Sequence, residues 1–238
     1  MAISVDTVYQ KVLALANKEQ RGYITPQEYN LLASQAQLEI FEQYFYDIDI
    51  VELKLKENTT EYSDRITVLN EKIAPFENQG VAMSALSTAT ATLPTSATVH
   101  KLGTVFYNGV IIEEVQAGEV VRMTNTALYA PTQSRPVYVR KSATQLDIKP
   151  ASATPAYSTS NVSCNFIAKP VNPNWGYAVV NNKAMYNSAA SSNFELHPSE
   201  ESELVYKILE LAGIILNKPG LVQLADKEQV EIKNKKLI

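Results

Sequence analysis

The stretch Val105-Phe106-Tyr107-Asn108-Gly109-Val110-Ile111-Ile112 lies near the middle of the chain and predicts a β-hairpin. Its two flanks consist of β-branched and aromatic residues, which favour strands. Asn108-Gly109 between them accepts the positive φ angles of a type I′ turn, which matches the twist of two antiparallel strands. The centre of the chain is therefore expected to fold as antiparallel β structure.

Beyond this hairpin, strand-forming runs alternate with turn-forming residues. They predict further strands at Glu119–Met123, Pro136–Lys141, Gln145–Lys149 and Asn161–Lys169. The last run alternates apolar and polar residues, which is typical of a half-buried strand, and places Cys164 on the apolar side as a small buried hydrophobe. Short strands separated by Pro and Gly predict a small barrel or sandwich over residues 79–178.

Residues 84–98, at the start of this β domain, have an unusual composition. Twelve of the fifteen are Ser, Thr or Ala. Such small side chains fill a core poorly, so the segment is expected to be a flexible loop or an extended arm that orders against another chain. In the second case Ser87, Thr90 and Thr92 are candidate inter-subunit contacts.

Residues 1–78, before the β domain, read as helices. Thr25-Pro26-Gln27-Glu28 is a start signal, with a capping threonine, a proline at the first helical position and a glutamate that completes a capping box. The helical pattern then continues to about Lys56, a length of roughly 45 Å. A break near Asp47–Asp49 is the alternative. A further helix is expected over Glu61–Ile73.

Residues 179–238 are expected to return to the helical segment. A helix begins at Pro198 and carries an apolar face of Leu204, Ile208, Leu211 and Ile215. The predicted fold class is thus α+β, with helical N- and C-terminal segments packed together and a central small antiparallel β-barrel or sandwich. The three parts are 1–78, 79–178 and 179–238.

Two aromatic groups are candidate contact residues. Phe41, Tyr44 and Phe45 on the long helix suit a core position, a subunit contact or a ligand shelf. Trp175 and Tyr177 flank a glycine and suit a packing corner between the domains or a sugar platform. The abundance of tyrosine, 13 residues against 6 phenylalanines, is typical of half-buried interfaces. We therefore predict inter-subunit contacts at all five positions.

Charge limits the partners of this chain. Its 238 residues hold 21 Lys and Arg against 25 Asp and Glu, a net charge of −4, whereas a general nucleic-acid coat is normally basic. Residues 79–193 are locally positive, with 8 basic and 4 acidic side chains. Within them Arg135, Arg140 and Lys141 are candidates for contacting nucleic acid or for lining a channel.

Enzymatic chemistry has little support in the sequence. None of the phosphate-loop, dinucleotide, serine-hydrolase or zinc-protease motifs occurs. Two histidines and one cysteine exclude a zinc site built from these residue types alone. No catalytic residue, metal site or cofactor is predicted. No export signal or membrane-spanning run is present, so we expect a protein made in a reducing cytosol, with no membrane partner.

Three blocks of the sequence have distinctive residue patterns. They are Tyr23-Ile24-Thr25-Pro26-Gln27-Glu28-Tyr29-Asn30 with the helix that follows it, Ala168-Lys169-Pro170-Val171-Asn172-Pro173-Asn174-Trp175-Gly176-Tyr177, and Phe194-Glu195-Leu196-His197-Pro198-Ser199-Glu200-Glu201-Ser202-Glu203-Leu204 running on to Ile214. Together they resemble the virion neck or ring proteins of crAss-like and related tailed bacteriophages. The blocks reach from near the N-terminus to about Ile215, whereas 79–100 and the last fifteen residues match nothing characteristic of that family.

The resemblance implies a structural subunit of the head-to-tail connector in the virion, assembled in the host cytoplasm. Such proteins form a closed ring, commonly of twelve copies, below the portal protein. They touch the genomic DNA transiently as it passes through the channel, and they dock other neck and tail ring proteins. Two alternatives remain at this point. One is a tail-fibre or receptor-binding β module, and the other is a cell-wall or glycan hydrolase that uses scattered carboxylates.

Overall fold

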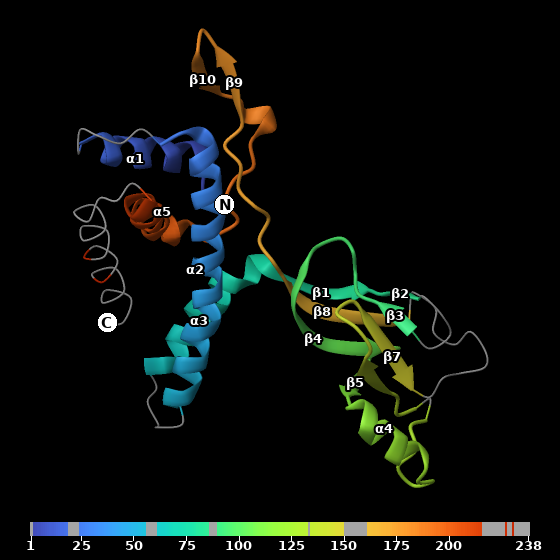
Figure 1. Ribbon diagram of the computed structural model, residues 1–238. Helices are drawn as coiled ribbons and strands as arrows, with labels where there is room; N and C mark the ends of the chain where they lie inside the picture. The colour runs from blue at the N-terminus through green and yellow to red at the C-terminus, as the bar shows by residue number, and fades with distance from the viewer. Residues whose placement is uncertain are drawn as a thin grey trace. The chain divides into compact units, whose positions relative to one another are not determined.

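The structure is a computed structural model that describes residues 2–18, 24–55, 61–85, 90–132, 134–149 and 161–215, together with Lys227 and Val230. The chain divides into two compact units (Figure 1). The helical unit comprises Met1–Pro75 and Pro170–Ile238, and the β unit comprises Phe76–Lys169. Because long helices and an extended sheet occur in separate parts of one chain, the predicted α+β class is confirmed.

Two helices open the helical unit, α1 (Val5–Lys18) and α2 (Pro26–Leu55). The predicted capping box starts α2: the Glu28 N–H donates to Thr25 Oγ1 at 3.3 Å, and the Thr25 N–H donates to the Glu28 carboxylate at 2.9 Å. The Thr25 hydroxyl also donates to the Glu28 carboxylate at 2.7 Å, and this bond, together with the one from the Thr25 N–H, lowers the pKa of Glu28. No Gly or Pro follows Pro26 within α2, so the helix runs unbroken through Asp47–Asp49.

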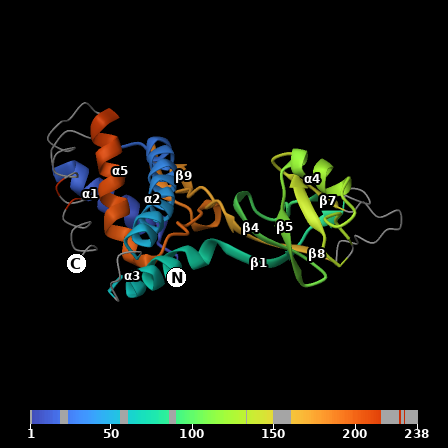
Figure 2. The same cartoon turned by 90° about the horizontal axis from the view of Figure 1, so that it is seen from below.

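Two more helices complete the described part of this unit, α3 (Glu61–Ile73) and α5 (Glu201–Ile215). The bounds of α3 are those predicted, and a 3₁₀ turn at Ala74–Phe76 follows it. Pro198–Glu200 forms a 3₁₀ turn that leads directly into α5, consistent with the predicted start at Pro198. α2 packs against both α3 and α5, and α5 also packs against α1 (Figure 2).

The contacts between these helices bury aliphatic and aromatic side chains, among them Val8, Val12, Tyr29, Ala33, Ile40, Phe41, Leu204, Ile208 and Leu209. A buried ion pair adds a polar link: Lys72 Nζ, near the end of α3, lies 2.7 Å from Glu200 Oε1, and the Glu200 side chain is fully buried. Removing one partner of such a pair leaves a buried charge, which costs about 3–5 kcal/mol. The pair therefore fixes the end of α3 to the start of α5.

The β unit contains one eight-stranded sheet. Its strands are β1 (Glu77–Ala82), β2 (Ser84–Ala85), β3 (Thr90–Thr92), β4 (Val99–Tyr107), β5 (Val110–Glu114), β6 (Val137–Arg140), β7 (Gln145–Lys149) and β8 (Val162–Ala168). The order is β1-β8-β4-β5-β6-β7-β3-β2. Only Met83 separates β1 from β2, and its N–H donates to the Val162 carbonyl at 2.9 Å. The two strands at the ends of the strand order are therefore separated by one residue in the chain, and the sheet curls back on itself.

One pair of strands corrects the expectation of a wholly antiparallel sheet: β5 and β6 run parallel. A parallel pair needs a crossover of a dozen or more residues. Residues 115–136 supply it, and they include helix α4 (Ala117–Thr124). The predicted strand at Glu119–Met123 is therefore wrong. Its two valines suggested a strand, but Val120 packs with Val115 and Val137 while Val121 is exposed.

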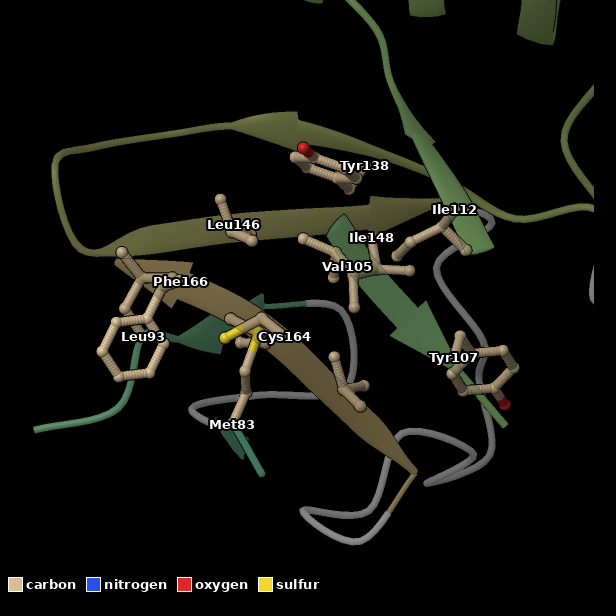
Figure 3. Packing of buried hydrophobic residues seen from close by; sticks show 12 residues of the cluster. Met83, Leu93, Val105, Tyr107, Ile112, Tyr138, Leu146, Ile148, Cys164 and Phe166 are labelled. Atoms are coloured by element: carbon tan, nitrogen blue, oxygen red, sulfur yellow. The ribbon is translucent and has the colours of Figure 1, made fainter. Parts of the chain in front are cut away.

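The other central strands agree with the prediction. Asn108 and Gly109 have φ angles of 49° and 78°, as the Asn-Gly turn requires. The sheet encloses a core that includes Met83, Leu93, Val105, Ile112, Tyr138, Leu146, Ile148, Val162 and Phe166 (Figure 3). Cys164 lies within it, confirming its role as a small buried hydrophobe, and burial raises the pKa of its thiol to about 11.

The described part of residues 84–98 is not a free arm, contrary to expectation. β2 pairs with β3, and β3 pairs with β7 of the same chain. Ala91 and Leu93 are buried in the β core. The small side chains of this segment fit on a tightly curled sheet. Leu93, the large apolar residue of the segment within the described strands and turns, packs into the β core.

Candidate functional site: the β9–β10 hairpin

A second, two-stranded sheet belongs to the helical unit. It is a hairpin of β9 (Tyr177–Val180) and β10 (Lys183–Tyr186), paired antiparallel from Tyr177 opposite Tyr186 to Val180 opposite Lys183. Asn181 and Asn182 form the turn with φ angles of 50° and 59°, the left-handed conformation of a type I′ turn. In Figure 1 the hairpin projects from the helices at the top of the view.

Apolar side chains are exposed on both faces of this hairpin. Tyr177, Val179, Ala184 and Tyr186 share one face, and Ala178, Val180, Lys183 and Met185 share the other. Val179 is 67% exposed, Met185 is 55% exposed and Val180 is 53% exposed. An isolated two-stranded hairpin is at best marginally stable in water. This hairpin therefore needs support at its base, and it presents an apolar surface to solvent.

Aromatic rings supply part of that support. Trp175 stacks on Tyr177, with ring centroids 5.9 Å apart, and its ring lies 5.8 Å from that of Tyr186. On the helical side the Trp175 ring lies 4.4 Å from that of Tyr9, which in turn lies 4.7 Å from that of Tyr29. A continuous chain of rings thus connects the hairpin to α1 and α2.

Hydrogen bonds hold the same tryptophan from the backbone and from the ring. The Trp175 N–H donates to Asn30 Oδ1 at 2.8 Å, and Asn30 Nδ2 donates back to the Trp175 carbonyl at 3.3 Å. The indole N–H donates to Asp6 Oδ1 at 2.9 Å. Each polar group of this buried residue therefore has a partner, which holds the ring in one orientation.

Gly176 closes the base of the hairpin. Its N–H donates to Ser191 Oγ at 3.0 Å, and its carbonyl accepts from the Asn187 N–H at 2.8 Å. A Cβ at this position would lie 2.6 Å from the backbone of Ala190, closer than real Cβ contacts. Only glycine fits here, so the two ends of the hairpin are tied together directly beneath β9 and β10.

The predicted aromatic contact residues differ in how deeply they are buried. Phe41, Tyr44 and Trp175 are buried within the helical unit, so they are core residues and not inter-subunit contacts. For Trp175 this burial also excludes the sugar platform. Phe45 is half-buried and packs edge-on against Phe41. Tyr177 is half-buried at the hairpin base, where its hydroxyl accepts from Gln27 Nε2 at 3.4 Å.

Two of the contact residues predicted in segment 84–98 bond or pack within their own β unit, and the third lies outside the described residues. Thr90 is buried in its own unit. Thr92 donates its hydroxyl proton to the Ser84 carbonyl at 3.0 Å across the β2–β3 pair. Both threonines therefore serve their own sheet, since Thr90 and Thr92 lie on β3. Ser87 lies outside the described residues.

The three candidate channel-lining cations are exposed but are not gathered at one point. Arg135 precedes β6, whereas Arg140 ends that strand and Lys141 follows it. The strand itself thus separates Arg135 from the other two. They form two positive positions at opposite ends of β6, which suits weak contact with a long polyanion better than a pocket for a small anion.

A cavity of about 510 Å³ lies beside α4. Gln116, Glu119, Arg122, Met123 and Tyr129 contribute to its lining. Tyr129 is 58% exposed, and the neighbouring Leu128 is 84% exposed. Within the described ranges, no three residues of the types His, Cys, Asp and Glu are grouped so that they could hold a metal ion.

Sequence reasoning missed the β9–β10 hairpin because Tyr177–Tyr186 is short and carries no Asn-Gly turn. The available signal was Asn181-Asn182, since asparagine tolerates the left-handed conformation, between runs of apolar residues. The three distinctive sequence blocks converge near its base. Asn30 bonds to Trp175, and Gln37 Nε2 donates to the Val171 carbonyl at 2.8 Å. Glu195 in turn accepts from the Val171 N–H at 2.8 Å.

Comparison with models of known protein families and with curated proteins found no match to either. Among the helices that the structure describes, none combines the length and the apolar character needed to cross a membrane. The hairpin and its base therefore stand as the candidate functional site on their geometry: an apolar projection on a base held by hydrogen bonds and stacked aromatic rings.

Proposed function

We propose that this chain is a structural subunit of the phage head-to-tail connector. It forms a ring below the portal, lines the DNA channel and docks tail components. The observation that carries the proposal is the β9–β10 hairpin, whose Val179, Val180 and Met185 are exposed on a base that buries Trp175. Exposed apolar side chains on a rigidly held element are typical of a surface that another protein covers.

Two further observations support this function. The three blocks that resemble neck proteins meet around Trp175 and Val171, at the foot of the same hairpin. The helical N- and C-terminal segments give that foot a broad platform, because α5 packs against α1 and α2. A projection on a helical platform suits a ring, in which each subunit needs a surface to offer and a surface to receive.

The β unit suits the passage of DNA. Arg135, Arg140 and Lys141 are exposed on it, while the whole chain carries a net charge of −4. A conduit must touch phosphate weakly, since strong basic contacts would retain the genome. The partners are therefore further copies of this chain, the portal protein, other neck and tail ring proteins and, transiently, the genomic DNA. The proposed location is the virion.

Native mass spectrometry of the full chain, alone and with the portal protein, tests this proposal. We expect a closed ring on the portal complex. The double variant V179D/M185D should stay folded but lose ring formation, because it places charge on both faces of the hairpin. The matched control is Val68→Asp, which changes a valine on α3 that is also half exposed, at 50%.

A compact monomer that portal complexes do not recruit would contradict the proposal, and so would equal loss of the ring in V68D. Binding of the purified chain to host cells would instead favour the receptor-binding alternative. Electron cryo-microscopy of intact particles then places the subunit relative to the portal.

A further inference from the structure

One face of α2 is directed away from the helical core. Leu31, Gln35, Leu38, Glu42, Tyr46 and Asp49 recur at helical spacing and fall within one narrow arc, which we call the α2 stripe. Leu31 is 69% exposed and Tyr46 is 66% exposed. The stripe runs over 19 residues, from Leu31 to Asp49, about 27 Å of helix. It is long enough to receive a strand pair and partly apolar, but no described residue of the chain covers it.

The α2 stripe also carries negative charge at Glu42 and Asp49. Among the described residues, no cation forms an ion pair with Glu42 or Asp49, whereas the neighbouring Glu39 is paired with Lys207 at 2.9 Å. The β9–β10 hairpin has the opposite character. Tyr177–Tyr186 contains Lys183 and no carboxylate, and no ion pair of Lys183 occurs in the described part of the chain. The two surfaces are complementary in charge, and both are apolar around those charges.

The hairpin cannot reach the α2 stripe of its own chain. Gln27 and Asn30, in the first turns of α2, hold the base of the hairpin through Tyr177 and Trp175. From there the hairpin extends past the start of α2 and away from the rest of that helix (Figure 1). Glu42 lies on the remote part of the helix, so contact between Lys183 and Glu42 requires two molecules.

We infer that the β9–β10 hairpin of one copy binds the α2 stripe of a second copy, with Lys183 of the first beside Glu42 of the second. The inference rests on the proposed ring function and specifies its subunit contact. Val179, Val180 and Met185 supply apolar area, and the ion pair sets the register. Because the two surfaces differ, the contact is heterologous, and repetition around an axis closes a ring.

Charge exchange tests the ion pair. Lys183→Glu and Glu42→Lys each place like charges together, so each single variant should weaken association between copies about tenfold or more. The double variant K183E/E42K restores opposite charges and should recover most of that loss. Lys101→Glu on β4 and Glu71→Lys on α3 are matched exposed controls that should leave association unchanged. Failure of the double variant to recover would overturn the pairing.

A crosslinking experiment covers weak association. Lys183→Cys and Glu42→Cys are made in separate preparations, mixed and oxidised, while the native Cys164 stays buried. We expect crosslinked dimers in the mixture and few in either preparation alone, with Lys101→Cys mixed with Glu42→Cys as the control. Equal crosslinking of K183C with itself, or yields no higher than the control, would overturn the heterologous contact.

These outcomes separate the two proposals. A ring that forms on the portal but shows neither charge recovery nor the mixed crosslink keeps the connector function and rejects this contact. A mixed crosslink in a protein that portal complexes never recruit keeps the contact and rejects the connector function.

Discussion

Two hairpins of this chain have the same kind of turn but differ in the structure around them. β4–β5 turns through Asn108-Gly109 and β9–β10 through Asn181-Asn182, each with two positive φ angles. The first hairpin has neighbours on both sides of the sheet, with β8 beside β4 and β6 beside β5. The second has none and stands on aromatic rings. A turn sequence thus specifies a hairpin, but the residues around it decide whether the hairpin builds a core or displays a surface.

The largest expected effect concerns the base of the exposed hairpin. Trp175→Ala removes the ring between Tyr9 and Tyr177 and leaves Asp6 without its indole partner. We expect a loss of about 3–5 kcal/mol in the stability of the helical unit. Chemical denaturation followed by helical circular dichroism measures this loss.

Trp175→Phe is the control for that substitution, because it keeps one aromatic ring, while it loses the indole N–H and the second ring of the indole. It should cost less than Trp175→Ala, about 1–2 kcal/mol, because most of the aromatic packing remains. If Trp175→Ala and Trp175→Phe were equally mild, the hairpin would not depend on its aromatic base.

The next effect concerns the buried hairpin. Ile112 on β5 is 3% exposed within the β core, whereas its neighbour Ile111 is 66% exposed. Ile112→Ala should destabilise the β unit by about 3 kcal/mol, and Ile111→Ala by less than about 0.5 kcal/mol. Hydrogen exchange of the β-unit amides reports the two values separately from the helical unit. Equal losses would contradict the burial of Ile112 and the exposure of Ile111.

A smaller effect concerns the turn of the same hairpin. Gly109 has a φ angle of 78°, which a residue with a Cβ adopts at a cost, so Gly109→Ala should destabilise the β unit by about 1 kcal/mol. Gly118 lies in α4 with open space around it, and Gly118→Ala should be neutral or slightly stabilising. The melting temperatures of the two alanine variants test this. A lower melting temperature for Gly118→Ala than for Gly109→Ala would refute the assigned turn.

Alkaline pH should weaken the sheet beside β5. Burial and the neighbouring Glu114 raise the pKa of Tyr138 to about 12. The unfolded chain therefore loses this proton near pH 10, before the folded chain does, and stability contributed by Tyr138 is present below pH 10 and lost as the pH rises toward 12. Between pH 10 and pH 12, the free energy of unfolding from chemical denaturation should fall more steeply for the native protein than for Tyr138→Phe. Parallel curves would show that Tyr138 does not contribute.

The smallest effect belongs to the tip of the exposed hairpin. Val179→Ala should change the free energy of unfolding by less than about 0.5 kcal/mol, because Val179 is 67% exposed. Val105→Ala, at a position that is 1% exposed on β4, is the contrast and should cost about 2 kcal/mol. A large loss of unfolding free energy in V179A would mean that the hairpin is part of the core.

Periodicity predicted the long elements of this fold well. The helices from Pro26 and over Glu61–Ile73 and the strands near Gln145–Lys149 and Asn161–Lys169 are all present. Local pattern failed where tertiary contacts decide the outcome. The valines of α4 have strand propensity, yet the parallel β5–β6 pair demands a crossover there.

The site itself was harder to predict. Phe41, Tyr44 and Trp175 were expected at subunit contacts, but they are core residues of the helical unit. An aromatic side chain suits a core and an interface equally well, so residue type alone cannot separate the two. The hairpin that carries the exposed surface is made of Val, Ala and Met, whose exposure depends on the absence of a covering element.

The connection between β1 and β2 is one residue long, which limits the chain length that the curled sheet accepts at this point. β1 is in register with β8 and β2 with β3, and Met83 alone spans the distance between these two pairings. An extra residue inserted here shifts one pairing by a position, which turns its side chains to the opposite face, unless the strand takes up the residue as a bulge, as β1 does between Asn78 and Val81. The chain length at Met83 is therefore constrained by two strand pairings at once, one on each side of this residue.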